Sequence, residues 1–460
     1  METSGALQLE DVLQHRVTAE CLAIFNANGT MRKTQKSKLQ QKLTMTVIPE
    51  PDVYTSIIDM GLIWRLTTPT TEDREKGDGT KYTWGDYAQK LVRSVLARHK
   101  NAERIICVND SYDQNHSIKD SERILRQKHL PIRNVYMKSK DKFPSNKEFH
   151  ALLSKPENKL RLQAFIQTAF QNSAKITSTE IIYGVVGSTT KNLTTDKIVS
   201  ALSCDHAEAD TAMFTIYSVL RSEGYTKAVV LDTEDTDNYV QAAYVAQMTS
   251  GLTLLKRKHE LISARCLCNE AMAASIIQLH VLTGCDHNSG FYGASKRLIA
   301  DRLEKSQEAH NLLAACGTCL PVTQGVITDL ERFVIRYVYC DTKSKTLADV
   351  RAAKWRAQKK KSTVRLVPDS DSLRPHLERA NYLAYLQRNY TLQSHPSPIG
   401  HGWHLVNGMC LPIRSTQPPL PPSISLPSAP QTAANHDNTS ESDGSDLDTS
   451  CSETSGDSDA

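Results

Sequence analysis

The stretch Val229–Val240, VVLDTEDTDNYV, decides the fold. It opens with apolar residues typical of a buried strand and then reaches Asp232, Glu234, Asp235 and Asp237 without a spacer. Carboxylates this close raise one another's pKa, so such a cluster is costly unless another group compensates the charge. The stretch therefore predicts a buried strand that ends in a charged loop, and it raises the question of what neutralises that loop.

The same pattern recurs on both sides of this stretch. Short apolar segments are followed by segments with helical periodicity, some of which begin at an N-cap residue and stop at a glycine. We expect strands at residues 53–59, 102–110 and 227–232, and helices at residues 83–100, 206–224, 236–248 and 268–286. This alternation predicts an α/β fold with a mainly parallel, twisted sheet flanked by helices.

Composition divides the chain into four parts. Residues 45–300 carry the alternating strands and helices, residues 1–44 form an N-terminal extension, and residues 301–412 predict a mostly helical C-terminal extension. Residues 413–460 join a Pro/Ser-rich spacer to an acidic Ser/Asp segment. Such a composition cannot build a core, so we expect a disordered tail.

The charge of the chain is unevenly distributed. Residues 431–460 contain eight acids and no Lys or Arg, so the formal net charge of +4 conceals a body that is more positive by those eight charges. A basic body suits a polyanionic partner. Generic solubility charge is the alternative. The acidic tail is suited to a basic protein partner.

Other features bound the class of protein. No apolar run approaches the roughly 18 residues of a membrane span, and the first residues lack a secretory signal pattern. Eleven cysteines without such a signal indicate a reducing compartment. We expect free thiols at the pairs Cys316/Cys319 and Cys266/Cys268, with a zinc site as the alternative. A nuclear protein is expected, or else a cytoplasmic one, but not a secreted one.

The acids at the strand ends point to a metal site. Asp59, Asp110 and the Asp232–Asp237 cluster each follow an apolar strand, and the carboxyl ends of parallel strands meet at one edge of a sheet. Oxygen ligands without His or Cys favour Mg²⁺ or Mn²⁺, and two such ions can activate water for phosphodiester cleavage. The alternative is a set of solvated acidic loops.

The residues that carry these acids resemble the flap endonuclease/XPG superfamily of 5′ nucleases, which has a PIN-like fold. Five motifs stand in the family's order: IIDMGLIW, ICVND, HAEADTA, EDTDNY and VLTGCDHNSGFYG. The resemblance implies a two-metal site in residues 45–300. The acids that match the family's motifs are Asp59, Asp110, Glu208, Asp210, Asp235, Asp237 and Asp286.

The resemblance also implies how the acids divide between the ions. The four acids from Asp59 to Asp210 would serve one ion, and the three acids from Asp235 to Asp286 would serve the second, with Asp210 as a bridge. Asp232 and Glu234 fall outside the motifs and are expected behind the ligands or in solvent.

A narrower resemblance covers about residues 50–412. The segments SIKDSERILR, HLERANY and GHGW are similar to a group of uncharacterised animal proteins that are frequent in genomes rich in mobile elements. This chain departs from the superfamily's pattern at Asn109, where that pattern has an aromatic residue. It departs from the narrower group's pattern with Ser111 instead of Arg, and with YGASKR where that group has a Gly/Lys repeat.

Two sets of cations are candidates for phosphate binding. Lys119, Arg123 and Arg126 share one face of an expected helix. The resemblance implies that Lys119 and Arg126 grip the scissile phosphate. Arg123, on the same face, is a candidate for contact with the nucleic acid. The alternative is a solvated helix face.

The second set follows Asp286. Gly293, Lys296 and Arg297 match the place of a basic turn that holds duplex phosphates in the superfamily. Residues 351–361, RAAKWRAQKKK, suggest either a nuclear import signal or a nucleic-acid patch, and a solvated helix fits equally well. The isolated histidines His280, His287 and His376 are expected to be structural.

These observations favour a divalent-metal-dependent nuclease that cleaves DNA, in a structured or flapped form. Three alternatives remain open. One is a nucleic-acid-binding pseudonuclease, one is a scaffold protein with an acidic recruitment tail, and one is a nuclease directed at RNA.

Overall fold

The computed structural model describes residues 8–75, 81–111, 118, 133–185 and 189–424. The chain divides into a large unit, Met1–Pro421, and a second unit, Pro422–Ala460. The N-terminal extension, the α/β part and the C-terminal helices therefore belong to one compact unit. The boundaries that composition suggests at residues 45 and 301 do not separate independent bodies.

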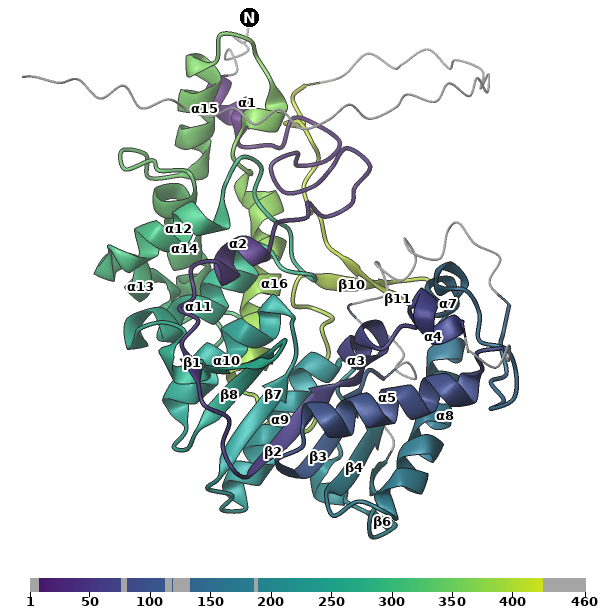
Figure 1. The fold of residues 1–460 in the computed structure, drawn as a ribbon. Coiled ribbons are helices and arrows are strands. Elements are labelled where there is room, and N and C mark those ends of the chain that lie inside the picture. Colours follow the sequence, from purple (N-terminus) through teal and green to yellow (C-terminus); the bar gives the residue numbers. More distant parts are fainter. Residues whose placement is uncertain (1–7, 76–80, 112–117, 119–132, 186–188, 425–460) are drawn as a thin grey trace, which may run out of the picture. The chain divides into compact units, whose positions relative to one another are not determined.

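A single large sheet runs through the described part of this unit (Figure 1). Its strands are β1 (Val47–Ile48), β2 (Tyr54–Asp59), β3 (Ala102–Asn109), β4 (Glu180–Val185), β5 (Thr190–Asn192), β6 (Lys197–Ile198), β7 (Ala228–Asp232), β8 (Thr253–Arg257) and β9 (Glu260–Ser263). The order across the sheet is β1-β9-β8-β7-β2-β3-β4-β5-β6. The five strands from β8 to β4 are parallel, whereas the two strands at each edge pair antiparallel. The expected α/β class with a mainly parallel sheet is confirmed.

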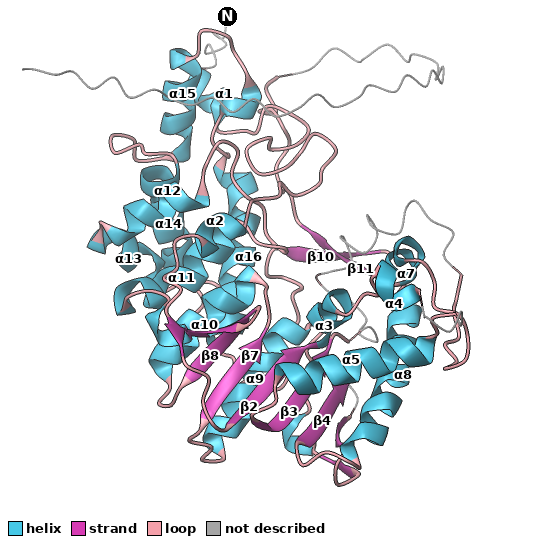
Figure 2. Ribbon diagram, viewed as in Figure 1, coloured by secondary structure: helices cyan, strands magenta, loops and turns pink. Residues whose placement is uncertain are grey.

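Helices cover both faces of the sheet (Figure 2). One face carries α3 (Met60–Leu66), α5 (Trp84–Arg98) and α8 (Pro156–Ala174), and the other carries α9 (Ala209–Ser222), α10 (Thr236–Met248) and α11 (Glu270–Leu282). Further helices pack beside α11: α12 (Lys296–Glu304), α13 (Gln307–Ala314) and α16 (Ser370–Arg388). Helix α2 (Ser37–Gln40) packs on α10 and α12, and α14 (Gln324–Phe333) packs on α13 and α16. The remaining α-helices of the described residues are α1 (Leu9–Leu13), α4 (Thr71–Arg74), α7 (Asn146–Leu152) and α15 (Leu347–Ala357). The chain is thus a three-layer α/β/α structure with a helical extension on one side.

The alternation of side chains along the strands determines which face each acid meets. In β2, Ile57 lies in the core beneath α9 and α10, whereas Ile58 lies in the core beneath α5. In β3, Val108 belongs to the core beneath α9. Asp59 and Asp110 stand two residues beyond Ile57 and Val108, so they occupy the α9 side at the carboxyl edge of the sheet.

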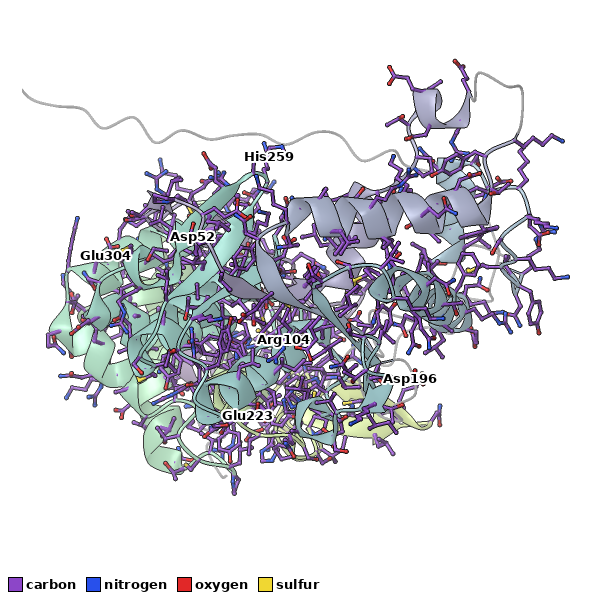
Figure 3. The ribbon with its side chains drawn as sticks, turned by 60° about the horizontal axis from the view of Figure 1, so that its bottom comes forward. Asp52, Arg104, Asp196, Glu223, His259 and Glu304 are labelled. Carbon is purple, nitrogen blue, oxygen red and sulfur yellow. The ribbon has the colours of Figure 1, made fainter. Side chains whose placement is uncertain are left out.

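The amino ends of the parallel strands form the opposite edge of the sheet. Figure 3 views the molecule from that edge, with Asp52 just before β2, Arg104 in β3 and Glu223 at the end of α9. Arg104 pairs there with Glu180 of the neighbouring strand, and both side chains are about one-third exposed. Such a surface ion pair contributes little to stability. It does not account for the acids that gather at the carboxyl edge.

The C-terminal extension is not purely helical. It ends in a hairpin of β10 (Trp403–Val406) and β11 (Met409–Pro412). The Ile413 amide donates to the Gly402 carbonyl, and the Pro419 carbonyl accepts from the Val17 amide, both at 2.9 Å. The boundary expected at residue 413 is therefore too early, because bonds to the body continue to Pro419.

Two further expectations concern the described residues alone. None of their helices is long and apolar enough to cross a membrane. None of the ten cysteines among them is in a disulfide, and this includes both close pairs for which a zinc site was the alternative.

Candidate metal centre

Asp59 and Asp110 come from neighbouring strands and begin the site. Asp59 ends β2 and caps α3, since its Oδ1 accepts from the Gly61 amide at 2.8 Å. Asp110 follows β3, and its Oδ1 accepts from the Ala209 amide at 2.9 Å, at the first residue of α9. Because one oxygen of each carboxylate is held by a main-chain donor, both side chains have a fixed orientation. The second bond also ties β3 to the start of α9.

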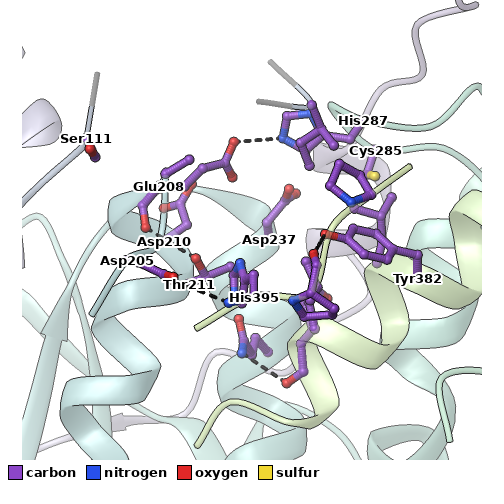
Figure 4. Close-up of a pocket in the computed structure, with 18 of the residues that line it drawn as sticks. Ser111, Asp205, Glu208, Asp210, Thr211, Asp237, Cys285, His287, Tyr382 and His395 are labelled. Carbon is purple, nitrogen blue, oxygen red and sulfur yellow. Dashed lines mark hydrogen bonds and ion pairs between the residues drawn. The ribbon is translucent and has the colours of Figure 1, made fainter. Parts of the chain in front are cut away.

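The start of α9 adds two more acids (Figure 4). Glu208 is the N-cap residue and Asp210 lies in the first turn, where the helix dipole favours negative charge. Asn238 Nδ2 donates to Asp210 Oδ1 at 2.7 Å, and His287 Nε2 lies 2.8 Å from Glu208 Oε1. These contacts connect α9 with α10 and with the segment that follows α11. His287 is therefore a site residue, although the sequence suggested only a structural role.

The last three acids converge on one point. Asp235 caps α10 and accepts from the Asp237 amide at 2.9 Å, while Asp286 follows α11. The Lys36 ammonium lies 3.0 Å from Asp235 Oδ1, 3.1 Å from Asp237 Oδ1 and 2.9 Å from Asp286 Oδ2. Three carboxylates, two from the start of α10 and one from the segment after α11, thus surround a single cationic atom. The seven acids that the motifs predicted are all half-buried at this edge of the sheet.

Sequence reasoning missed Lys36. It lies in the N-terminal extension, 199 residues before Asp235 and 250 before Asp286, at the N-cap of a four-residue helix. The local sequence RKTQKSKLQ has no motif that singles out one lysine. The available signal was indirect, because an acidic cluster of this size calls for a compensating cation.

Burial and charge shift the pKa values of the acids in different directions. Burial, and then the charge of Asp110, raise the pKa of Asp59 to about 7. Burial and the charge of Asp237 also raise the pKa of Asp235. Burial acts in the same direction on Asp237, but His280 and Lys36 outweigh it and hold the pKa of this carboxyl well below its usual range. The three acids around Lys36 in turn outweigh its burial and raise the pKa of its ammonium.

Two buried side chains, His280 and Lys296, form a chain of contacts that leads to Asp237. His280 Nε2 lies 2.8 Å from Asp237 Oδ1, and the Lys296 ammonium lies 3.0 Å from His280 Nδ1. Lys296 also donates to the His280 carbonyl at 2.6 Å and is 2% exposed. Burial lowers the pKa of this ammonium to about 7. The Lys296 side chain points inward and supports His280, so the expected contact of Lys296 with a nucleic acid backbone would require this side chain to leave its buried position.

The other predicted residues have varied positions. Arg297 is exposed, and Gly293 adopts a left-handed conformation with a φ of +70° in an open turn, so both stay candidates for phosphate contact. His376 is fully buried and contacts the Leu282 carbonyl at 2.9 Å, in line with a structural role. Lys119, Arg123 and Arg126 lie outside the described residues.

Asp232 and Glu234 are separate from the acids that gather at the site. Asp232 is fully buried on the α5 face, where Arg98 contacts both of its oxygens at 2.6 and 2.8 Å and His99 lies 2.8 Å away. Burial would raise the pKa of Asp232, but Arg98 and His99 lower it below its usual value. Glu234 is exposed. The expectation that both lie outside the ligand set agrees with these positions.

The basic segment at residues 351–361 is partly structural. Arg351 of α15 is 2% exposed and donates to the main-chain carbonyls of Leu13 and His15. Arg356 pairs with Glu10 of α1. Part of the charge in this segment therefore fastens the N-terminal extension to α15.

A pocket of about 570 Å³ lies beside the acids (Figure 4). Glu208, Asp210 and Asp237 line one side of it. The opposite wall comes from α16 and the segment after it, with Tyr382, Leu383, Leu386, Pro396 and Pro398. Asn238 Oδ1 and Ser111 Oγ line the pocket as buried polar atoms without a hydrogen-bond partner among the described residues. The pocket therefore combines an acidic side, an apolar side and unsatisfied polar groups.

The chemistry of the acids fits a divalent cation. All seven are oxygen donors, which Mg²⁺ and Mn²⁺ prefer, and three of them already surround one positive charge. Within the described ranges, however, no group of three or more His, Cys, Asp or Glu is close enough to hold a metal ion as it stands. A divalent ion would require the carboxylates to move closer, and at the second group it would also require Lys36 to move away.

The sequence matches no protein-family model and no curated protein. The function must therefore be argued from the geometry of the site.

Proposed function

We propose that the protein is a divalent-metal-dependent nuclease that hydrolyses phosphodiester bonds, with DNA as a better substrate candidate than RNA. The observation that carries the proposal is the convergence of seven half-buried acids from five separate segments at the carboxyl edge of a parallel sheet. Ligand sites in open α/β sheets lie at this edge. A PIN-like identity for the sheet domain belongs to the same proposal, with the order of the acid motifs as its support.

The acids form two groups, and each group suits one cation. Asp59, Asp110, Glu208 and Asp210 make the first group, and Asp235, Asp237 and Asp286 make the second. Paired cations in such a site activate a water molecule and neutralise charge on the phosphate and the leaving oxygen.

The residues behind the acids keep the carboxylates in position. His280 holds Asp237, His287 contacts Glu208, and Asn238 holds Asp210. Such supporting contacts commonly orient metal ligands and tune their basicity.

The pocket beside the acids is suited to the nucleotide next to the scissile phosphate. Its acidic side adjoins both groups of acids, and its apolar side offers Tyr382, Leu383 and Leu386 to a base or sugar. Asn238 and Ser111 add polar side chains to its lining. Arg297 and the positive body support binding of the phosphate backbone, and a nuclear location is part of the proposal.

The test is a cleavage assay on the full chain. Flapped, bubble and single-stranded DNA and single-stranded RNA are incubated with and without Mn²⁺. We expect metal-dependent cleavage that Asp237→Asn abolishes while affinity for nucleic acid stays equal or rises, because a negative charge beside the phosphate is removed. Glu234→Gln is the matched control, since this exposed acid lies three residues away, outside the site. Cleavage that survives in Asp237→Asn would refute the proposal.

Lys36 gives specific support to a second candidate function. Its ammonium already neutralises part of the acidic cluster, so the cluster can persist without any metal ion. The alternative is therefore a protein that binds nucleic acid at this edge without cleaving it. Binding without metal-dependent cleavage in the same assay would favour that alternative.

A further inference from the structure

The Lys36 ammonium contacts all three acids of the second group. A lysine ammonium carries three N–H donors, and the Lys36 Nζ has one carboxylate oxygen each from Asp235, Asp237 and Asp286 at 2.9–3.1 Å. The Lys36 side chain is 19% exposed, so these contacts are screened less than those of a surface lysine. The geometry is that of a bound cation with three anionic ligands.

The main chain holds Lys36 in place independently of the acids. The α2 helix that begins after Lys36 packs against α10 and α12, with Leu39 and Leu43 buried in the core. Lys42 pairs with Asp301 at 2.6 Å and with Glu304 at 3.1 Å, both on α12. The packing of α2 on α10 and α12, together with the ion pairs of Lys42, therefore fixes the position of Lys36.

A divalent ion and the Lys36 ammonium cannot share this position. Mg²⁺ needs carboxylate oxygens at about 2.0–2.1 Å, so an ion bound by the same three oxygens would lie near the point that Nζ occupies. Lys36 would have to leave before such an ion could bind. The ion pairs of Lys36 go to the second group, so its ammonium occupies the second of the two proposed cation positions.

We infer that Lys36 supplies the cation of the second position, so that the protein binds one divalent ion, at the Asp59 group, and uses the Lys36 ammonium in place of the other. The inference rests on the proposed function and makes it more specific. In this arrangement a fixed ammonium provides the positive charge and the N–H donors that a second ion would otherwise provide near the phosphate.

The test counts bound ions by calorimetric titration of Mn²⁺ into the metal-free full chain. We expect one ion per chain for the wild type and two for Lys36→Met, because the neutral side chain vacates the second group. Lys42→Met is the matched control, since it removes a lysine from the same segment outside the cluster, and it should still bind one ion. Two ions in the wild type, or one in Lys36→Met, would overturn the inference.

A second variant keeps the test decisive if Lys36→Met does not fold. Asp286→Asn removes one ligand of the second group only. If Lys36 is the cation there, this variant still binds one Mn²⁺, whereas loss of an ion from a wild-type count of two would overturn the inference. Two bound ions together with metal-dependent cleavage would leave the nuclease proposal intact, and no bound ion in any variant would refute both.

Discussion

Removal of the Lys36 charge should destabilise the metal-free protein strongly. At 3.0 Å and an effective dielectric constant of about 20, each unit-charge pair has a gross attraction of about 5 kcal/mol before desolvation is subtracted. Removing one partner of a buried ion pair typically costs about 3–5 kcal/mol. The Asp286 side chain is 45% exposed, so solvent screens its attraction to Lys36. The Asp237 side chain is 17% exposed, so its attraction to Lys36 is screened much less. We therefore expect Lys36→Met to lower the free energy of unfolding by about 3 kcal/mol.

Two features of the structure isolate this effect. Lys36 is the N-cap residue of α2 but makes no side-chain cap bond, so Met removes the charge and not a helix cap. Lys42→Met is the control, because its partners Asp301 and Glu304 are about one-third exposed. Such pairs contribute about 1 kcal/mol or less.

The stabilisation by Lys36 has a defined pH window. The folded pKa of Lys36 is raised, so its contribution is complete below the unfolded value of 10.5 and declines as pH rises through the folded pKa. The folded pKa of Asp237 is lowered, so the contribution is present above its unfolded value of 3.8 and is lost as pH falls through the folded pKa. Neutral pH lies inside both limits.

The measurement is urea unfolding of the metal-free full chain at neutral pH, for the wild type and both lysine variants. The reasoning is refuted if Lys36→Met costs no more than Lys42→Met. That result would mean that the three contacts around Lys36 do not persist in solution.

Two further predictions concern acids on opposite faces of the sheet. Asp232→Asn should destabilise the chain by about 3–5 kcal/mol, because it leaves the partly buried Arg98 without its carboxylate partner. Mn²⁺ binding should stay at the wild-type level. Urea unfolding tests the stability, and calorimetry tests the metal binding. The pKa of Asp59 is raised in the folded state, so between about pH 4 and pH 7 this carboxyl keeps its proton when folded and loses it when unfolded. The stability of the metal-free protein therefore falls by up to about 1.4 kcal/mol per pH unit as pH rises through that window. Asp110→Asn should narrow this pH window, because it removes the repulsion that raises the pKa of Asp59. A wild-type stability that falls with pH no faster near pH 5 than near pH 8 would contradict the assignment.

The sequence by itself determined the fold class and the edge at which the acids gather. Strand residues alternate between two faces, so the spacing of Ile57 to Asp59 and of Val108 to Asp110 already places both acids on one face.

The ends of helices were predicted less accurately than the strands. The helix expected at 268–286 spans Glu270–Leu282, because Asn269 caps it and Gly284 adopts a φ of +109° in close contact with Gly290.

Only the tertiary structure decided how the acids are neutralised. Lys36 meets Asp235 and Asp286 across 199 and 250 residues, and no local periodicity reports a contact at such separations. The inward orientation of Lys296 had the same origin, because the burial of a side chain depends on the helices packed around it. The apolar wall of the pocket likewise depends on α16, more than 80 residues beyond the last acid. Local propensity and strand alternation are encoded within a few residues, whereas the charge balance of a site is set by whichever segments the fold brings together.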